Sequence, residues 1–167
     1  KNGKPSTALN LGTISTCVVF AVMTVALVLL GGYDISILWS TLIGLVTGVL
    51  IGNTTEFFTS EDFKPVKETA RVSGSGAAIT IITGFSYGLL SILPSIVGIV
   101  IATLVSFHFT EASGVVSGIY GIGISAVGML AVSGMIVSAD AYGPIVDNAR
   151  GIAEMAGMKH EVIERAD

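Results

Sequence analysis

The ionised side chains of this 167-residue chain leave four long stretches without any charge. These stretches cover residues 5–33, 35–55, 72–110 and 112–139. A helix needs about 20 mainly apolar residues to cross the hydrocarbon core of a bilayer, and each stretch reaches that length. Together with a mean hydropathy of +0.84, the pattern predicts an all-α fold, a polytopic transmembrane helix bundle with four spanning helices.

The composition excludes the main alternatives to a membrane protein. Charged residues make up 12% of the chain, whereas soluble domains carry about 25%, so a soluble enzyme could not cover its surface with polar groups. The 51% hydrophobic content excludes a disordered segment, and the single cysteine, Cys17, excludes a disulfide scaffold. An isoelectric point near 5.0 without a large basic cluster excludes a nucleic-acid partner.

The third uncharged stretch has two interpretations. At 1.5 Å per residue it would form a helix of about 58 Å, which is too long for one upright span. It is either one long helix, with a kink permitted at Pro94, or two separate crossings.

The lysines and arginines favour a single crossing, because such residues in short loops stay on the cytoplasmic side. With one crossing all eight lie on that side, and the two outer turns carry only Asp34 and Glu111. Two crossings would place Arg150, Lys159 and Arg165 outside. We therefore expect both ends of the chain to be cytoplasmic. The expected spans are residues 9–31, 35–58, 72–107 and 112–140, followed by a cytoplasmic helical extension over 141–167.

Glycines recur every four residues in the second expected span, at Gly44, Gly48 and Gly52. This spacing lets helices approach backbone to backbone in lipid. It predicts close helix packing rather than a binding site.

Two carboxylates, Asp140 and Asp147, stand seven residues apart at the end of the fourth span, and Glu154 and Glu161 continue the spacing. On one continuous helix such residues share a face. The stripe is either a solvated helix face or a cation site. Asp140 favours the second interpretation, because an ionised group next to an apolar span is costly and usually functional. Mg²⁺ suits such ligands, since it takes one or two carboxylates and completes its shell with water and phosphate oxygens.

The segment 140–158, DAYGPIVDNARGIAEMAGM, carries a specific resemblance. With TEFFTS at 55–60 and Glu164-Arg165-x-Asp167, it is similar to the membrane-bound, ion-translocating inorganic pyrophosphatases. The resemblance covers nearly the whole chain. Members of that family have about sixteen spans of roughly 20 residues each, so we expect this chain to be an internal fragment of a larger pump.

The resemblance implies an activity and a site. The family hydrolyses Mg²⁺-bound pyrophosphate at the cytoplasmic face and moves H⁺ or Na⁺ out across the membrane, with K⁺ needed in a subset. It implies that Asp147 and Asn148 bind substrate and that Asp147 and Asp140 hold metal, the rest of the catalytic site lying outside the fragment. The fragment alone would then be inactive. A homodimer in the lipid bilayer of the cell (inner) membrane, or of an acidic organelle, is expected.

The chain departs from the family pattern at two places, and at the first Ile79-Thr80 stands where a Thr-Asn pair is usual, which removes an amide from the third helix. At the second, Arg150 stands where a glycine is usual, and it would modulate the site either by pairing with substrate phosphate or by crowding a helix contact. Two alternatives of other classes follow from the residues alone. One is a fragment of a secondary cation transporter without phosphate chemistry, and the other is a structural membrane module with a solvated acidic face.

Overall fold

The computed structural model describes residues 5–166, and within them the chain forms only helices. The elements in order are α1 (Pro5–Gly31), α2 (Ile35–Thr59), α3 (Lys64–Val72), a 3₁₀ turn (Ser73–Ser75), α4 (Ala77–Ser113), α5 (Gly118–Leu130), α6 (Ser133–Met155) and α7 (His160–Ala166). The expected all-α class is confirmed.

Four helical stretches are long and apolar enough to cross a membrane, which confirms the predicted number of spans. They are Ala8–Gly31, Ile35–Ser75, Ala77–Ser113 and Gly118–Met155. The second of these includes α3 after the end of α2, and the fourth includes a break between α5 and α6. The exact limits of each span within the bilayer stay predictions.

The third uncharged stretch forms a single helix, α4, as the lysine and arginine distribution favoured. Its 37 residues correspond to about 56 Å, and the helix continues through Pro94. The preceding Ser73–Ser75 segment is a 3₁₀ turn that ends at Gly76, where φ is +117°. Only glycine adopts this backbone readily, so α4 begins at Ala77, five residues after the expected start of the span.

The fourth uncharged stretch is divided between elements. Its first residues belong to the end of α4, which runs to Ser113. Its remainder is interrupted between Leu130 and Ser133, where Ala131 donates to the carbonyl of Gly128 and Met135 to that of Val132. We expected one continuous helix here. At the break, two hydrogen bonds between residues three apart interrupt the regular series of bonds between residues four apart.

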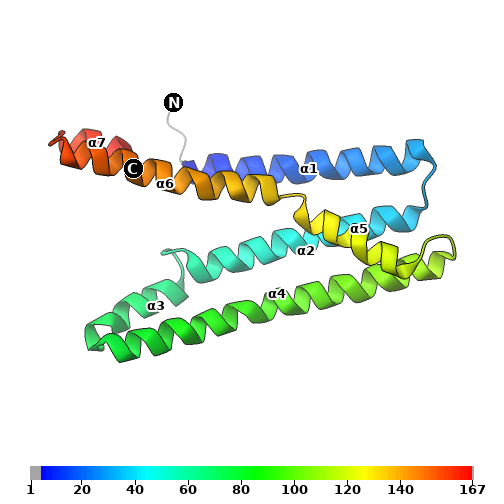
Figure 1. The fold of residues 1–167 in the computed structure, drawn as a ribbon, viewed down its shortest axis with the longest axis horizontal. Helices are drawn as coiled ribbons and strands as arrows, with labels where there is room; N and C mark the ends of the chain where they lie inside the picture. Colours follow the sequence, from blue (N-terminus) through cyan, green and yellow to red (C-terminus); the bar gives the residue numbers. More distant parts are fainter. Residues whose placement is uncertain (1–4, 167) are drawn as a thin grey trace. The chain divides into compact units, whose positions relative to one another are not determined.

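The chain divides into two compact units, one formed by Val19–Ala131 and the other by the residues up to Val18 together with those from Val132. In the first unit α2 and α4 run antiparallel and α5 packs against both (Figure 1). Asp34 at the start of α2 and Glu111 near the end of α4 therefore lie at one end of this unit, and α3 with its cations at the other.

Backbone contact at glycines joins α2 to α5. A Cβ atom at Gly44 would overlap the carbonyl oxygen of Ser125, and one at Gly128 would overlap the carbonyl oxygen of Thr41. Gly48 lies close to the backbone of Met129, with the Met129 oxygen 2.7 Å from a Cβ built there. The glycine spacing therefore predicts packing correctly at two positions, whereas Gly52 meets no atom within 4 Å in this chain.

Buried hydroxyls occur on each of the three helices α2, α4 and α5 that pack in this unit. Ser40 of α2 and Ser106 of α4 are fully buried, Ser125 of α5 is 1% exposed, and the Oγ atoms of all three have no hydrogen-bond partner among the described residues. Leaving a buried hydroxyl unpaired is unfavourable, but the small serine side chain lets the helices pack closely. The buried part of this unit therefore holds polar groups as well as close helix contacts, which the hydropathy of the chain does not reveal.

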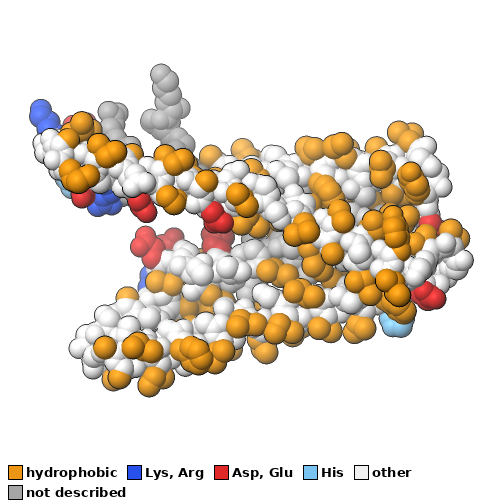
Figure 2. Space-filling view, viewed as in Figure 1, with side chains coloured by type: hydrophobic (Ala, Val, Ile, Leu, Met, Phe, Trp, Pro, Cys, Tyr) orange, Lys and Arg blue, Asp and Glu red, His pale blue; other side chains and the backbone are white. Residues whose placement is uncertain are grey.

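Large apolar side chains cover the outside of the helices (Figure 2). Leu30 of α1, Ile81 of α4 and Ile119 of α5 are each at least 70% exposed. Soluble proteins rarely present so much continuous apolar surface. The outer faces therefore suit lipid or further protein rather than water.

We predict that Gly44→Leu weakens the packing of α2 on α5, because the new side chain must displace the backbone at Ser125. Overpacking of this kind costs about 1–3 kcal/mol, measurable as a lower thermal midpoint of the full-length protein in detergent. Gly52→Leu, two turns along the same helix, is the control. Equal losses at the two positions would contradict the assigned contact.

Candidate functional site

The acidic residues predicted to form a cation site lie on α6. Asp140 and Asp147 are both exposed, and both belong to one uninterrupted helix. The helix continues through Pro144, although proline has no N–H to donate to the carbonyl of Asp140 four residues earlier. The two carboxylates therefore share a face, as the sevenfold spacing predicts.

Asn148 does not share that face. It follows Asp147 directly, and successive residues of an α-helix are rotated by about 100°. The amide of Asn148 and the carboxylate of Asp147 belong to the same turn, but they do not project together. Both side chains are exposed.

Arg150 and Glu154 form an ion pair on the same helix. The guanidinium Nε of Arg150 donates to Oε1 of Glu154 at 3.2 Å, and the side chains are 46% and 53% exposed. Arg150 lies three residues after Asp147 and Glu154 lies seven after it. Positions at this spacing are neighbours on a helix surface, so the guanidinium of Arg150 lies between the carboxylates of Asp147 and Glu154.

The prediction that Glu161 extends the acidic stripe is wrong. α6 ends at Met155, and Gly157 has a φ of +65°. Gly157 donates to the carbonyl of Glu154 and Met158 to that of Ala153, which is the hydrogen-bond pattern of a Schellman motif. Glu161 therefore belongs to a separate helix, α7. Gly157 in the sequence could have predicted this end.

The described residues supply only part of a metal site. Among the side chains that the structure describes, those of residues 8–163, no three or more of His, Cys, Asp or Glu gather closely enough to hold a metal ion. Seven residues of helix advance about 10 Å, so Asp140 and Asp147 are placed to serve different ions. One carboxylate per ion agrees with the chemistry of Mg²⁺, which accepts few protein ligands and keeps water or phosphate oxygens.

Asp34 and Glu111, at the end of the Val19–Ala131 unit away from α3, have structural partners. Asp34 accepts a hydrogen bond from the backbone N–H of Ser36 at 2.9 Å as the N-cap of α2. The nearby Ser36, through its hydroxyl dipole and its backbone N–H, lowers the pKa of Asp34. Glu111 Oε2 accepts from the N–H of Gly118 at 2.8 Å, at the start of α5. Sequence reasoning treated both as topology markers and missed these caps.

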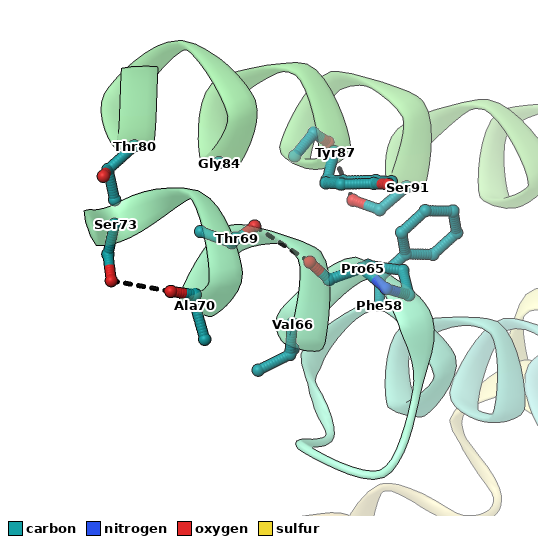
Figure 3. Close-up of a pocket in the computed structure, with 11 residues that line it drawn as sticks. Phe58, Pro65, Val66, Thr69, Ala70, Ser73, Thr80, Gly84, Tyr87 and Ser91 are labelled. Carbon is teal, nitrogen blue, oxygen red and sulfur yellow. Dashed lines mark hydrogen bonds between the residues drawn. The ribbon is translucent and has the colours of Figure 1, made fainter. Parts of the chain in front are cut away.

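A pocket of about 440 Å³ lies where the end of α2, α3 and α4 meet (Figure 3). Phe58 and Pro65 line one side and Tyr87 the other. Its hydroxyls bond locally, Thr69 to the carbonyl of Pro65 at 2.9 Å and Ser73 to that of Ala70 at 2.6 Å. None of its lining residues is charged, so the pocket does not suit a phosphate.

Comparison with known proteins identifies the family. All of residues 1–167 match the family model described as inorganic H⁺ pyrophosphatase. The chain belongs to this family. The resemblance carried by residues 140–158 is thereby confirmed, and the interpretation as a secondary transporter is not favoured.

Relatives within the inorganic H⁺ pyrophosphatase family include pumps for both ions. A putative K⁺-stimulated pyrophosphate-energized sodium pump of Clostridium tetani is 42% identical over 164 residues, covering 98% of this chain and 24% of the relative. A K⁺-insensitive pyrophosphate-energized proton pump of Moorella thermoacetica is 35% identical over 173 residues, covering 100% and 25%. The chain thus spans about a quarter of the length of these relatives, and it is a segment of a multi-pass membrane protein.

We predict that Glu111→Ala loosens the start of α5, because the N–H of Gly118 loses its carboxylate acceptor. Hydrogen exchange of the Gly118–Gly121 amides in the full-length protein should speed up several-fold, in line with the loss of one charge-assisted bond. Glu111→Gln keeps an acceptor oxygen and should show a smaller change. Unchanged exchange in Glu111→Ala would remove the assigned cap.

Proposed function

We propose that this chain is a four-span segment of a membrane pump that hydrolyses Mg²⁺-bound pyrophosphate and exports H⁺ or Na⁺. The observation that supports this most directly is the match of the whole chain to the inorganic H⁺ pyrophosphatase family. The relatives are named as pyrophosphate-energized pumps. The exposed carboxylates of α6 supply the kind of ligand that such a substrate needs.

In this proposal Asp147 binds substrate through Mg²⁺. Asp140, about two helical turns closer to the membrane interior, serves a second ion. Pyrophosphate carries several negative charges, so a carboxylate can hold it only by way of a cation; bound Mg²⁺ supplies that neutralisation and polarises the phosphoryl oxygens. Asn148, on the neighbouring face, donates amide hydrogen bonds to phosphate oxygens or to water around them.

The remaining ligands come from parts of the protein outside this segment. One helix with two well-separated carboxylates cannot surround a pyrophosphate, and we propose that the segment is inactive by itself. The whole pump is proposed to act as a homodimer in the cell membrane or an acidic-organelle membrane. Its relatives include K⁺-stimulated and K⁺-insensitive forms, so K⁺ is proposed as an activator in only some members.

We predict that Asp147→Ala in the full-length pump lowers pyrophosphate hydrolysis about 100-fold or more, the effect typical of losing one preorganised electrostatic contact to a reacting phosphate or acyl group. Phosphate release from isolated membranes measures it. Glu161→Ala, on α7 and off the α6 face, is the matched control and should retain activity.

Near-normal turnover in Asp147→Ala would refute the role of this carboxylate. Wild-type membranes that take up cation without releasing phosphate from pyrophosphate would instead refute the pump and favour a secondary transporter.

A further inference from the structure

Three serines carry buried, unpaired hydroxyls on the helices α2, α4 and α5, each of which packs against the other two. Ser40 and Ser106 are fully buried and Ser125 is 1% exposed, and no described residue offers their Oγ atoms a hydrogen-bond partner. We call these three the junction serines. A fourth such hydroxyl, that of Ser36, lies beside the carboxylate of Asp34 and so has a local explanation.

Hydroxyls inside a helix commonly donate to the carbonyl four residues earlier in the same helix. Thr41, which follows Ser40 directly, donates to the carbonyl of Ile37 at 2.8 Å, and Ser86 of α4 donates to that of Ile82 at 2.8 Å. The junction serines make no such bond. Because the neighbouring helices bury them, their hydroxyls face those neighbours rather than their own backbone.

The register of α2 against α4 places Ser40 and Ser106 at nearly the same level. The Cγ2 atom of Thr47 lies 3.4 Å from a Cβ atom built at Gly98, so these two positions are opposite each other. Ser40 lies seven residues before Thr47, and Ser106 lies eight residues after Gly98. The two helices are antiparallel (Figure 1), so both steps lead toward the same end. The difference of one residue corresponds to about 1.5 Å along the helix axis.

The third hydroxyl comes to this level on α5. A Cβ atom built at Gly121 lies 2.8 Å from the carbonyl oxygen of Ser106, and Ser125 follows Gly121 by four residues on the same face. The carbonyl oxygen of Ser125 in turn meets Gly44, four residues after Ser40 on α2. The levels of the three hydroxyls therefore differ by about one helical turn, yet none of them bonds directly to another.

Water is the ligand that suits this arrangement. Polar groups that lie beyond direct hydrogen-bond distance of one another are commonly bridged by a water molecule. A buried water typically makes about three hydrogen bonds to polar groups that are otherwise unpaired. Each serine hydroxyl can both donate and accept, so the three can share one water oxygen. A metal cation suits the junction serines less well, because neutral hydroxyls leave its charge uncompensated in an apolar surrounding.

We propose that Ser40, Ser106 and Ser125 bind an internal water molecule that joins α2, α4 and α5 through hydrogen bonds. The water satisfies three buried hydroxyls whose desolvation is otherwise a cost to folding. It also adds polar contacts to the glycine contacts between α2 and α5. The inference does not depend on the proposed function.

Serine-to-alanine variants of the full-length protein in detergent test the proposal, with hydrogen exchange of the 118–130 amides as the measure of α5 opening. Each single variant, such as Ser106→Ala, should speed up exchange about fivefold, as expected for the net loss of one hydrogen bond. The triple variant should change exchange by less than the three single effects combined, because no hydroxyl then stays unpaired. Ser86→Ala is the matched control, since Ser86 is exposed on α4 and bonds to its own helix. It should leave exchange of these amides unchanged.

High-resolution density for the full-length protein gives a second, direct measurement. It should show a water oxygen about 2.8 Å from the Oγ atoms of at least two junction serines. Unchanged or slower exchange in the single variants would overturn the proposal, because loss of an unpaired hydroxyl costs nothing. Density in which the hydroxyls bond to their own helices or directly to one another, with no water between them, would overturn it as well.

Discussion

Backbone contact between α2 and α5 is the constraint on which the Val19–Ala131 unit depends. In an apolar solvent the hydrophobic effect does not drive one helix against another, so close packing and polar contacts must hold them together. Gly44 and Gly128 provide this packing because neither leaves room for a Cβ atom. Ser40, Ser106 and Ser125, one on each of α2, α4 and α5, are buried in the same unit. With these helices fixed, the ends that bear Asp34 and Glu111 are also fixed.

The sequence predicts the number of spans well and their interruptions poorly. Charge is excluded from a bilayer so strongly that the uncharged stretches alone predict four spans, and the basic residues predict that 72–110 is one helix. The break at Ala131–Val132 follows from no charge and no proline, because the sequence has neither between Ala112 and Ala139. The start of α4 could have been placed better, because Gly76 adopts a backbone that few other residues tolerate.

The part of the candidate site that lies on a single helix could be predicted from the sequence. The sevenfold spacing places Asp140 and Asp147 on one face of α6, and the structure agrees. The prediction that Glu161 continues the acidic stripe fails because α6 ends before it, at Gly157. The pairing of Arg150 with Glu154 was not foreseen, although residues four apart on a helix commonly pair. Ligands contributed by other helices cannot be read from a chain that spans about a quarter of its relatives.

Pro144 has a consequence for the solvent around α6. Since it offers no hydrogen to the main-chain oxygen of Asp140, one step of the helical ladder stays open at that turn. Hydrocarbon offers no donor to such an oxygen, so wherever this turn meets lipid a water molecule or a donor from another part of the full-length protein must reach it. The same residue carries an exposed carboxylate, so this turn of α6 presents two groups that favour water over lipid.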